Sequence, residues 1–282
     1  MMNFDEVQNI AYLGPQGSFS EMATDEFCAK YNIQARPTPL STIKQVVEYV
    51  DSNPNTLGVL PVENSIEGTV TQSLDNLMFT KNPNIYILSE YIMPIHHCLL
   101  ARTTEISSIT NIISHPQALA QCQNFIHNEM PYHINIIEAS STAEAARSLV
   151  NYNLTYAAIG SKKTAEVYYL NVLRENINDD KTNRTRFVLI GDFETEPTEE
   201  DRTSLAFSTP NKPGALLEVL KVFLENDINL SYIASRPSKH KFGDYIFIVN
   251  FDGHINDPKM FQTIQQVRQK TDFLRFLGSY SK

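Results

Sequence analysis

Cysteine is scarce in this 282-residue sequence, and long apolar runs are absent. The three cysteines, Cys28, Cys98 and Cys122, are an odd number at wide spacing without a Cys-x-x-Cys pair, which argues against a disulfide framework and a cysteine-based zinc site. No stretch approaches the roughly 18 to 20 apolar residues of a membrane span, and residues 1–8 are acidic where a signal peptide has a basic flank. We therefore expect a cytoplasmic protein with buried thiols.

Positive charge is also in deficit, because 23 basic residues against 32 acidic ones give a net charge of -9. Without a long basic run, this balance argues against nucleic acid or an anionic membrane as a partner. The content of 42% apolar and 20% charged residues is that of an ordinary globular chain, which at this length exceeds one small core. We expect two domains and a small-molecule ligand.

An acidic segment divides the chain. Residues 192–201 (DFETEPTEED) contain six acidic residues and a proline, a composition typical of a linker. Before it, short apolar runs at 10–13, 57–62 and 112–114 alternate with helical patterns, which predicts α/β layering around a largely parallel sheet. The expected division is residues 1–191, the linker 192–201, and residues 202–282.

Local patterns refine this division. Capping boxes are predicted at Thr42 with Gln45 and at Ser141 with Glu144, and residues 119, 122 and 126 predict one further helix. After the linker the predicted order is βαββαβ, and Pro213 lies in the first turn of its first helix. The predicted strands and helices are strands 204–208, 228–235, 244–251 and 273–278 and helices 213–226 and 258–270.

Four loops of the first region follow predicted strands, where α/β sheets hold ligands because helix N-termini present free amides to anions. They are GPQGSFS at 14–20, PVENSIEGTV at 61–70, SHPQALAQC at 114–122 and NRTRF at 183–187. The first lacks the G-x-G-x-x-G of dinucleotide sites and the G-K-[ST] of a P-loop, so no nucleotide cofactor is expected. Each loop also fits a plain helix cap or turn, and from the residues alone both interpretations stay open.

In this order, and with STAEAA at 141–146 and AAIGS at 157–161, these segments resemble the prephenate dehydratase family. NKPGALLEVL at 211–220 and ASRP at 234–237 resemble the ACT regulatory domain that follows it in that family. The resemblance implies a monofunctional carbon-oxygen lyase of phenylalanine biosynthesis, which converts prephenate to phenylpyruvate without a cofactor or a metal. It also implies two α/β lobes of the periplasmic-binding-protein type around an active-site cleft, followed by a ferredoxin-like ACT domain.

The resemblance implies roles for single residues. Thr185 is expected at the leaving hydroxyl group. The other residues expected to contact prephenate are Ser18, Asn64, Ser65, Ser114, Gln121, Arg186 and Phe187. Because an aliphatic alcohol is a poor acid, Thr185 is expected to align or relay a proton that Glu63 supplies. A partly desolvated carboxyl group beside a bound dianion retains its proton, although Glu63 also fits a role in orienting Asn64.

Arg186 is a candidate ligand for a substrate carboxylate, because its planar guanidinium group binds in a bidentate manner. Neighbouring side chains of a strand point to opposite faces, so Thr185 and Arg186 need not both face the cleft. In that case backbone amides after Gly17 and Gly68 would hold much of the anion, and Phe187 would lie on the side of Thr185.

In the family, paired ACT domains bind L-phenylalanine at their interface and inhibit the enzyme. The matching positions in this sequence are Asn211, Pro213, Gly214, Ala215 and Leu216, together with Ser235, Arg236 and Pro237. Ala234 stands where the family commonly has glutamate, which removes an anionic partner for the ammonium group of the effector. Because the effector site is built between subunits, a homodimer or a tetramer is expected.

Two other functions stay open. One is an arogenate dehydratase, whose substrate carries an amino group in place of the keto oxygen of prephenate. The other is a non-catalytic amino-acid sensor that retains the fold without turnover, against which the intact Thr185, Asn64, Ser114 and Gln121 argue.

Overall fold

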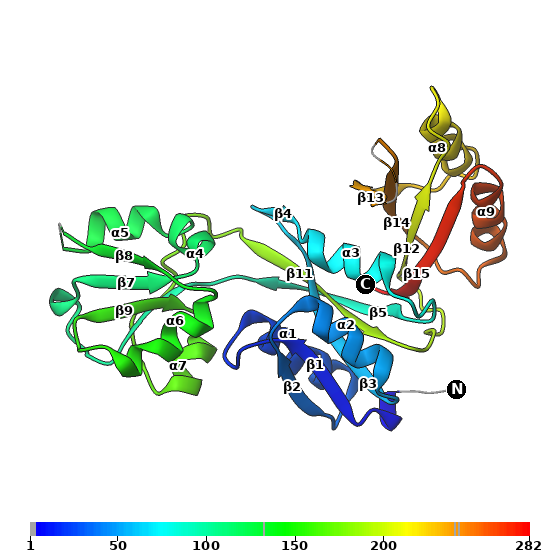
Figure 1. Cartoon of the computed structure of the whole chain (residues 1–282). Coiled ribbons are helices and arrows are strands. Elements are labelled where there is room, and N and C mark those ends of the chain that lie inside the picture. Colours follow the sequence, from blue (N-terminus) through cyan, green and yellow to red (C-terminus); the bar gives the residue numbers. More distant parts are fainter. Residues whose placement is uncertain (1–3, 132, 240, 242) are drawn as a thin grey trace.

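The computed structural model describes residues 4–282 except 132, 240 and 242. Two α/β lobes lie side by side, and a third α/β unit, the C-terminal domain, packs against the first of them (Figure 1). Positions 1–3 of the expected first region lie outside the described residues. Within the described ranges, no helix is both long and apolar enough to cross a bilayer.

Lobe 1 comprises residues 9–94 and 184–191, and its sheet has the order β5-β11-β3-β1-β2. Its elements are β1 (Asn9–Leu13), α1 (Phe19–Tyr31), β2 (Arg36–Leu40), α2 (Ile43–Ser52), β3 (Thr56–Asn64), β4 (Gly68–Thr69), α3 (Thr71–Phe79), β5 (Tyr86–Pro94) and β11 (Arg184–Gly191), preceded by a 3-10 turn at Phe4–Glu6. β1 runs parallel to β2 and β3, whereas β11 runs antiparallel between β3 and β5. The expectation of a largely parallel sheet is therefore wrong for the β11 side, because the chain leaves lobe 1 along β5 and returns along β11.

Lobe 2 comprises residues 98–174, and its sheet has the order β10-β6-β9-β7-β8. Its elements are β6 (Cys98–Ala101), a 3-10 turn (Ile106–Ser108), β7 (Asn111–Ser114), α4 (Pro116–Ala120), α5 (Gln123–Glu129), β8 (Asn135–Glu138), α6 (Thr142–Ser148), a 3-10 turn (Leu149–Asn151), β9 (Tyr156–Gly160), α7 (Lys162–Tyr168) and β10 (Asn171–Arg174). The single helix expected over positions 119–126 is broken between α4 and α5, because the backbone of Cys122 leaves the helical region (φ -126, ψ 22).

The predicted capping boxes form only in part. Thr42 and Ser141 accept hydrogen bonds from the amides of Gln45 and Glu144. The return bond is missing, since the side chain of Gln45 accepts from the amide of Ser41 and that of Glu144 pairs with Arg147. A reciprocal box forms instead at the start of α7, between residues 161 and 164.

Two connections join the lobes, residues 95–97 and 175–183, and they are hydrogen-bonded to each other. The side chain of Asn178 accepts from the amide of His97 (2.6 Å) and donates to the carbonyl of Ile95 (3.0 Å). The amide of Ile95 in turn donates to the carbonyl of Asn183 (3.0 Å). The buried amide of Asn178 thus replaces the backbone pairing that the sheet loses where the chain crosses between lobes.

The C-terminal domain has the predicted βαββαβ order. Its elements are β12 (Asp201–Ser208), α8 (Ala215–Glu225), β13 (Leu230–Pro237), β14 (Tyr245–Asp252), α9 (Pro258–Gln269) and β15 (Phe273–Ser281). Asp201 begins β12 rather than ending the linker, because its carboxylate accepts two hydrogen bonds from Thr198 and is buried. Pro213 precedes the first helix, because Gly214 at φ 83 is the N-cap and its left-handed backbone is not yet helical.

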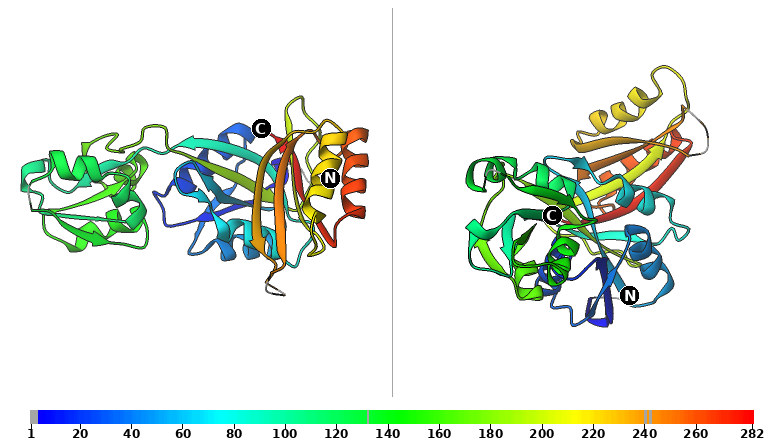
Figure 2. Two further views of the ribbon diagram at one scale, coloured as in Figure 1. Left: turned by 90° about the horizontal axis from the view of Figure 1, so that it is seen from above. Right: turned by 60° about the vertical axis from the view of Figure 1, so that its left-hand side comes forward.

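The C-terminal sheet continues into the sheet of lobe 1. β15 extends past the predicted end at Gly278, and Ser281 pairs with Ser89 of β5, which produces one ten-stranded sheet (Figure 2). One face of the C-terminal sheet packs on α8 and α9, and the other shares a core with lobe 1 that includes Ile248, Tyr280 and Val188. The C-terminal domain is therefore fixed to lobe 1 by shared apolar burial as well as by strand pairing.

A glycine makes the close approach of β15 to β5 possible. A Cβ atom on Gly278 (φ 134) would lie 2.3 Å from the carbonyl oxygen of Ile87. We expect Gly278→Ala to lower the free energy of unfolding by more than about 3 kcal/mol in urea titrations, because backbone must move.

The matched control for this variant is Gly214→Ala. Gly214 also has a positive φ (83), but a Cβ there would meet nothing within 4 Å. Its loss is expected to be about 1 kcal/mol, the cost of the backbone conformation alone. Equal losses for the two variants would contradict a steric requirement at Gly278.

Candidate active site

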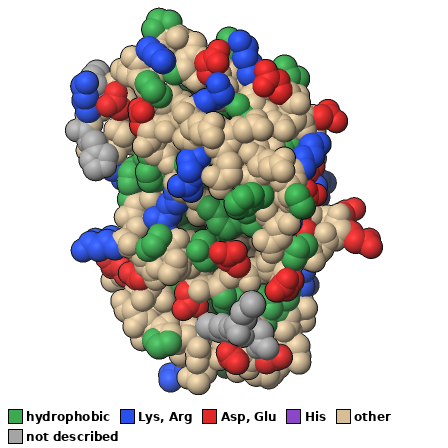
Figure 3. Space-filling view, turned by 90° about the vertical axis from the view of Figure 1, so that its right-hand side faces the viewer, with side chains coloured by type: hydrophobic (Ala, Val, Ile, Leu, Met, Phe, Trp, Pro, Cys, Tyr) green, Lys and Arg blue, Asp and Glu red, His purple; other side chains and the backbone are tan. Residues whose placement is uncertain are grey.

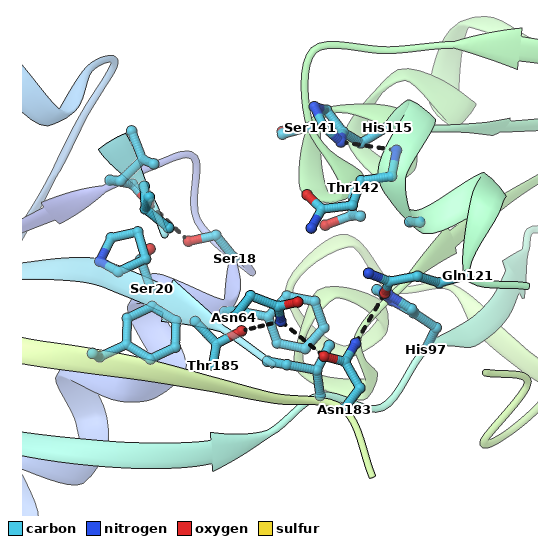
Figure 4. Close-up of a pocket in the computed structure, with 18 of the residues that line it drawn as sticks. Ser18, Ser20, Asn64, His97, His115, Gln121, Ser141, Thr142, Asn183 and Thr185 are labelled. Carbon is cyan, nitrogen blue, oxygen red and sulfur yellow. Dashed lines mark hydrogen bonds between the residues drawn. The ribbon is translucent and has the colours of Figure 1, made fainter. Parts of the chain in front are cut away.

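A cavity of about 320 Å³ lies between the two lobes, within the size range of small-molecule sites. Its walls come from the β1–α1 loop, the ends of β3 and β11, the start of α3, and the starts of α4 and α6 in lobe 2 (Figure 4). All four loops expected from the sequence contribute residues to it, and the fourth, NRTRF, contributes Asn183, Thr185 and Phe187.

The β1–α1 loop also joins the lobes at one end of the cavity. Ser18 caps α1 by accepting from the amide of Glu21 (3.3 Å) and donates to the carbonyl of Leu13 (3.0 Å). The carbonyl of Gly17 accepts from the hydroxyl groups of Ser161 (3.2 Å) and Thr164 (2.6 Å) of lobe 2. The G-x-x-G loop is therefore a lobe contact as well as a cavity wall.

Asn64 organises the floor of the cavity. Its Oδ1 accepts from the backbone amides of Ile66 and Glu67 (both 3.0 Å), which holds the residues that lead to α3. Its Nδ2 donates to Thr185 Oγ1 (2.9 Å) and to Asn183 Oδ1 (2.8 Å). Because Thr185 Oγ1 accepts this bond, the hydroxyl proton of Thr185 is left to donate elsewhere.

Lobe 2 reaches the same network through Gln121. Its Oε1 accepts from Asn183 Nδ2 (2.9 Å) and lies 3.2 Å from Nε2 of His97. Asn183 and His97, which the sequence interpretation did not assign, are both buried. Asn183 could have been noted as the first residue of NRTRF, but no sequence signal marks His97, because its position depends on the crossing between the lobes.

Alternation along β11 separates its side chains into two sets. Thr185 and Phe187 line the cavity, as expected for residues on one face of a strand. Arg186 points to the opposite face, where it contacts Glu63 (3.0 Å) and Glu90 (3.4 Å). The expectations that Glu63 supplies a proton and that Arg186 binds substrate therefore have no support from the geometry, because both side chains lie behind the cavity and neutralise each other.

This rear face forms an ion network with the C-terminal domain. Glu90 of β5, which is buried, also contacts Arg202 of β12 (2.5 Å). The guanidinium group of Arg186 lies 5.4 Å from the ring centre of Tyr232 on β13. A buried charge of this kind is tolerated only when paired, so the network specifies how the C-terminal domain sits on lobe 1.

Two further expected residues lie outside the cavity lining. The hydroxyl group of Ser114 is fully buried and donates to the carbonyl of Ile159 (2.7 Å), which ties β7 to β9. Ser65 accepts from the amide of Arg184 (2.9 Å) and so supports the β3–β11 register from the exposed side. Each hydroxyl group is hydrogen-bonded to the backbone of a neighbouring strand, so neither side chain extends into the cavity.

The expected effector residues fall into two groups. Asn211, Gly214, Ala215 and Leu216 line a surface depression with residues 243–245, and Pro213 lies in the turn beside it. Ser235, Arg236 and Pro237 lie on the edge strand β13 and do not line that depression, although Ser235 and Pro237 pair with Phe247 and Tyr245, which do. Arg236 points to lobe 1 and pairs with Asp75 of α3 (3.1 Å). Within one subunit, the two groups are therefore neighbours, but only the first lines the depression.

Comparison with known proteins identifies the chain. The prephenate dehydratase family model matches residues 10–195, and the ACT domain model matches residues 203–269. A prephenate dehydratase from Methanocaldococcus jannaschii is 40% identical over 96% of this chain and 97% of its own length. The chain belongs to the prephenate dehydratase family.

Solved structures agree with this assignment of fold. A prephenate dehydratase from Arthrobacter aurescens in complex with L-Phe is 33% identical, with a TM-score of 0.88 over 97% of this chain and 90% of its own. A protein described as a quorum-quenching acylase, GqqA, is 25% identical, with a TM-score of 0.85 over 97% and 98%. A protein with this fold is thus described as having a different activity. The function therefore has to be inferred from the residues of the site and not from the fold alone.

Most of the polar side chains that line the cavity of this prephenate dehydratase family member are amides and alcohols. Among the described residues that line it, there is no lysine or arginine. Burial lowers the pKa of His97 to about 4, and the hydrogen bond to Gln121 offsets this only in part. His97 is therefore neutral near pH 7 and brings no positive charge to the cavity.

The low pKa of His97 makes stability depend on pH. The unfolded chain takes up a proton on this histidine below about pH 6.5, whereas the folded protein does so only near pH 4. Stability is therefore lost as the pH falls from about 6.5 towards 4. We expect the free energy of unfolding to drop between pH 7 and pH 5 by about 2 kcal/mol more in the wild type than in His97→Gln.

The His97→Gln variant keeps a side-chain donor for Gln121 but removes the titrating group. A change in its stability that is the same at every pH therefore reports altered packing and not titration. Urea unfolding at several pH values measures the difference. Parallel pH profiles of the two proteins would contradict a buried neutral His97.

Proposed function

We propose that the cavity between the lobes binds prephenate and converts it to phenylpyruvate, with Thr185 acting on the hydroxyl group that leaves. The observation that carries this proposal is the hydrogen bond from Asn64 Nδ2 to Thr185 Oγ1 (2.9 Å). It leaves the hydroxyl proton of Thr185 free to donate, and Thr185 lines the cavity. A fixed donor aimed at a leaving oxygen stabilises the charge that develops there.

The reaction needs no electron acceptor from outside the substrate. The bond between the ring and its carboxylate breaks and releases carbon dioxide, and the electron pair moves through the ring diene. That pair expels the ring hydroxyl group, which leaves as water once a proton is added. Because the ring becomes aromatic, the protein has only to hold the dianion in one geometry and to donate to the leaving oxygen.

Neutral donors suit this chemistry. An ion pair to the carboxylate that is lost would stabilise the ground state more than the transition state, in which its charge has moved into the ring. Hydroxyl and amide donors bind the anion with a smaller difference between stabilisation of the ground state and of the transition state. Val70, the N-cap of α3, lines the cavity and has no side-chain capping bond. The amides of Ser73 and Leu74 donate to its carbonyl, so those of Thr71 and Gln72 are the amides of the first turn that can reach the substrate.

The test is an assay of phenylpyruvate formation from prephenate by the full chain. We expect turnover by the wild type without added metal or nucleotide, and a kcat about 10²- to 10⁴-fold lower for Thr185→Ala, because the donor at the leaving oxygen is gone. Thr185→Ser, which keeps the hydroxyl group, should stay within about tenfold of the wild type. An active Thr185→Ala variant would remove Thr185 from the mechanism.

Other activities are separated by the same assay. Faster turnover of arogenate than of prephenate would assign the chain to the related dehydratase. A folded wild type without turnover of either substrate would favour an amino-acid sensor. If this protein hydrolysed an acyl amide, it would need a nucleophile. An amidase activity that persists in Thr185→Ala but is lost in variants of other cavity residues would assign the protein to a hydrolase activity instead.

Inhibition by L-phenylalanine through the ACT domain is the regulatory part of the proposal. It is supported by contacts between β13, which carries the expected effector residues, and the segment that leads into the cavity wall. Tyr232 bonds Thr69 (2.8 Å between the hydroxyl oxygens), and Arg236 bonds Asp75 in α3. Burial acts to raise the pKa of Asp75, but the bonds from Arg236 and Lys239 outweigh it and lower the pKa. Movement of β13 would therefore reach the start of α3.

Ala234 lies on the side of β13 that carries Tyr232 and Arg236, since side chains two apart share a face. A glutamate at this position would therefore point towards lobe 1. We propose that its absence changes how the ACT domain holds lobe 1 more than how it contacts the effector.

A homodimer is part of the same proposal, because the family resemblance places the effector site at the interface of two ACT domains. Hydrophobic side chains are exposed between charged ones on the face seen in Figure 3. The exposed apolar residues of the C-terminal domain include Leu217, Leu224, Ile233, Tyr245 and Phe261. A cytoplasmic location and a tetramer of two dimers also remain proposals.

A further inference from the structure

Side-chain amide groups form a continuous hydrogen-bonded chain across the floor of the cavity. It runs from Asn64 on lobe 1 through Asn183 to Gln121 on lobe 2, and ends at His97. Asn183 is 1% exposed and His97 is 3% exposed, so solvent does not compete for these bonds. An amide group donates through its nitrogen and accepts through its oxygen. The orientation of one amide group in such a network therefore determines the orientation of the next.

Backbone groups fix that direction at Asn64. Its Oδ1 accepts from two backbone amides, at residues 66 and 67, which can only donate. Its Nδ2 faces the backbone carbonyl of Arg184 (3.1 Å), which can only accept. Turning the amide group of Asn64 would oppose like groups at all three positions, so Nδ2 has to be the end that faces Asn183 and Thr185, with its two protons shared among these two side chains and the carbonyl of Arg184.

Asn183 passes the direction to lobe 2. Its Oδ1 is used by Asn64, so its Nδ2 donates to Oε1 of Gln121. Because Oε1 of Gln121 is an acceptor, the nearby Nε2 of His97 has to carry the proton. Nδ1 of His97 is then an acceptor, and it has no hydrogen-bond partner among the described residues.

We propose that Asn183 is a positioning residue that fixes the orientation of the Gln121 amide group, so that its Nε2 donates into the cavity. Figure 4 shows this nitrogen on the cavity side of Gln121, away from Asn183 and His97. The orientation is independent of the reaction, but its use for an anionic substrate rests on the proposed function. Gln121 in the opposite orientation would present an oxygen to the anion and repel it.

The first experiment determines the direction of the hydrogen-bonded amide network and does not depend on turnover. Nitrogen-15 NMR of the His97 imidazole in the full chain at pH 7 reports which ring nitrogen carries the proton. We expect Nε2 in the wild type. In Asn183→Asp, the introduced carboxylate accepts only, so Gln121 turns to donate to it and His97 moves its proton to Nδ1. A wild-type proton on Nδ1, or the same tautomer in both proteins, would overturn the proposal.

The second experiment follows the pH dependence of kcat/KM for prephenate, as a ratio of variant to wild type. At pH 8 we expect Asn183→Asp to be about 10- to 100-fold below the wild type, the loss of one hydrogen bond to a charged group. The ratio should rise as the pH falls, because a protonated carboxyl group regains a donor for Gln121, and burial raises the pKa of such a group.

Asn183→Ala is the matched control, since it removes both ends of the amide group and cannot recover a donor. Its ratio to the wild type should stay low and flat with pH. A flat ratio for Asn183→Asp as well would overturn the proposal. Absence of wild-type turnover would instead contradict the proposed function, and the tautomer of His97 would still decide the direction of the chain.

Discussion

The alternation of side chains along β11 is the constraint on which both halves of the protein depend. Thr185 and Phe187 point into the cavity, and Arg186 between them points to the rear, where it meets Glu63 and Glu90. β11 lies between β3 and β5, so the same strand sets the floor of the cavity and the surface on which the C-terminal domain rests. A one-residue slip in its register would exchange the two sets of side chains, which would disrupt both the floor of the cavity and the ion pairs that hold the C-terminal domain.

The rear face explains why the C-terminal domain is attached so closely. Its sheet continues into that of lobe 1, and Arg202 shares the buried Glu90 with Arg186. A second contact, between Arg236 and Asp75, reaches α3 directly. Effector binding that moves β13 thus has a short physical route to the cavity, through the helix whose N-cap, Val70, lines it.

The sequence predicts the local parts of this structure well and the relations between distant parts poorly. The βαββαβ order, the strands at 10–13 and 57–62, and the loops around the cavity are predicted because periodicity and turn residues are local signals. The direction of β11, the pairing of Glu63 with Arg186 and the position of His97 depend on which strands become neighbours, and a single sequence does not contain that information. Ser114 shows the same limit, because its partner is a carbonyl 45 residues away.

The floor of the cavity is a set of amide and hydroxyl groups held in fixed directions. Asn64 bonds Thr185, Asn183 bonds Gln121 of lobe 2, and this network joins the lobes where we propose that the substrate binds. Preorganisation of this kind lowers the cost of reorganising dipoles during the reaction. It also accounts for a site without lysine or arginine among the described lining residues.

A crystal structure of the full chain with phenylpyruvate bound tests the central claim most directly. Our account requires the carboxylate of the ligand to lie between the lobes, with hydroxyl and amide donors such as Gln121 Nε2, while Arg186 stays paired with Glu63 and Glu90. A carboxylate bound to Arg186 on the rear face, or a Glu63 side chain turned into the cavity, would contradict it.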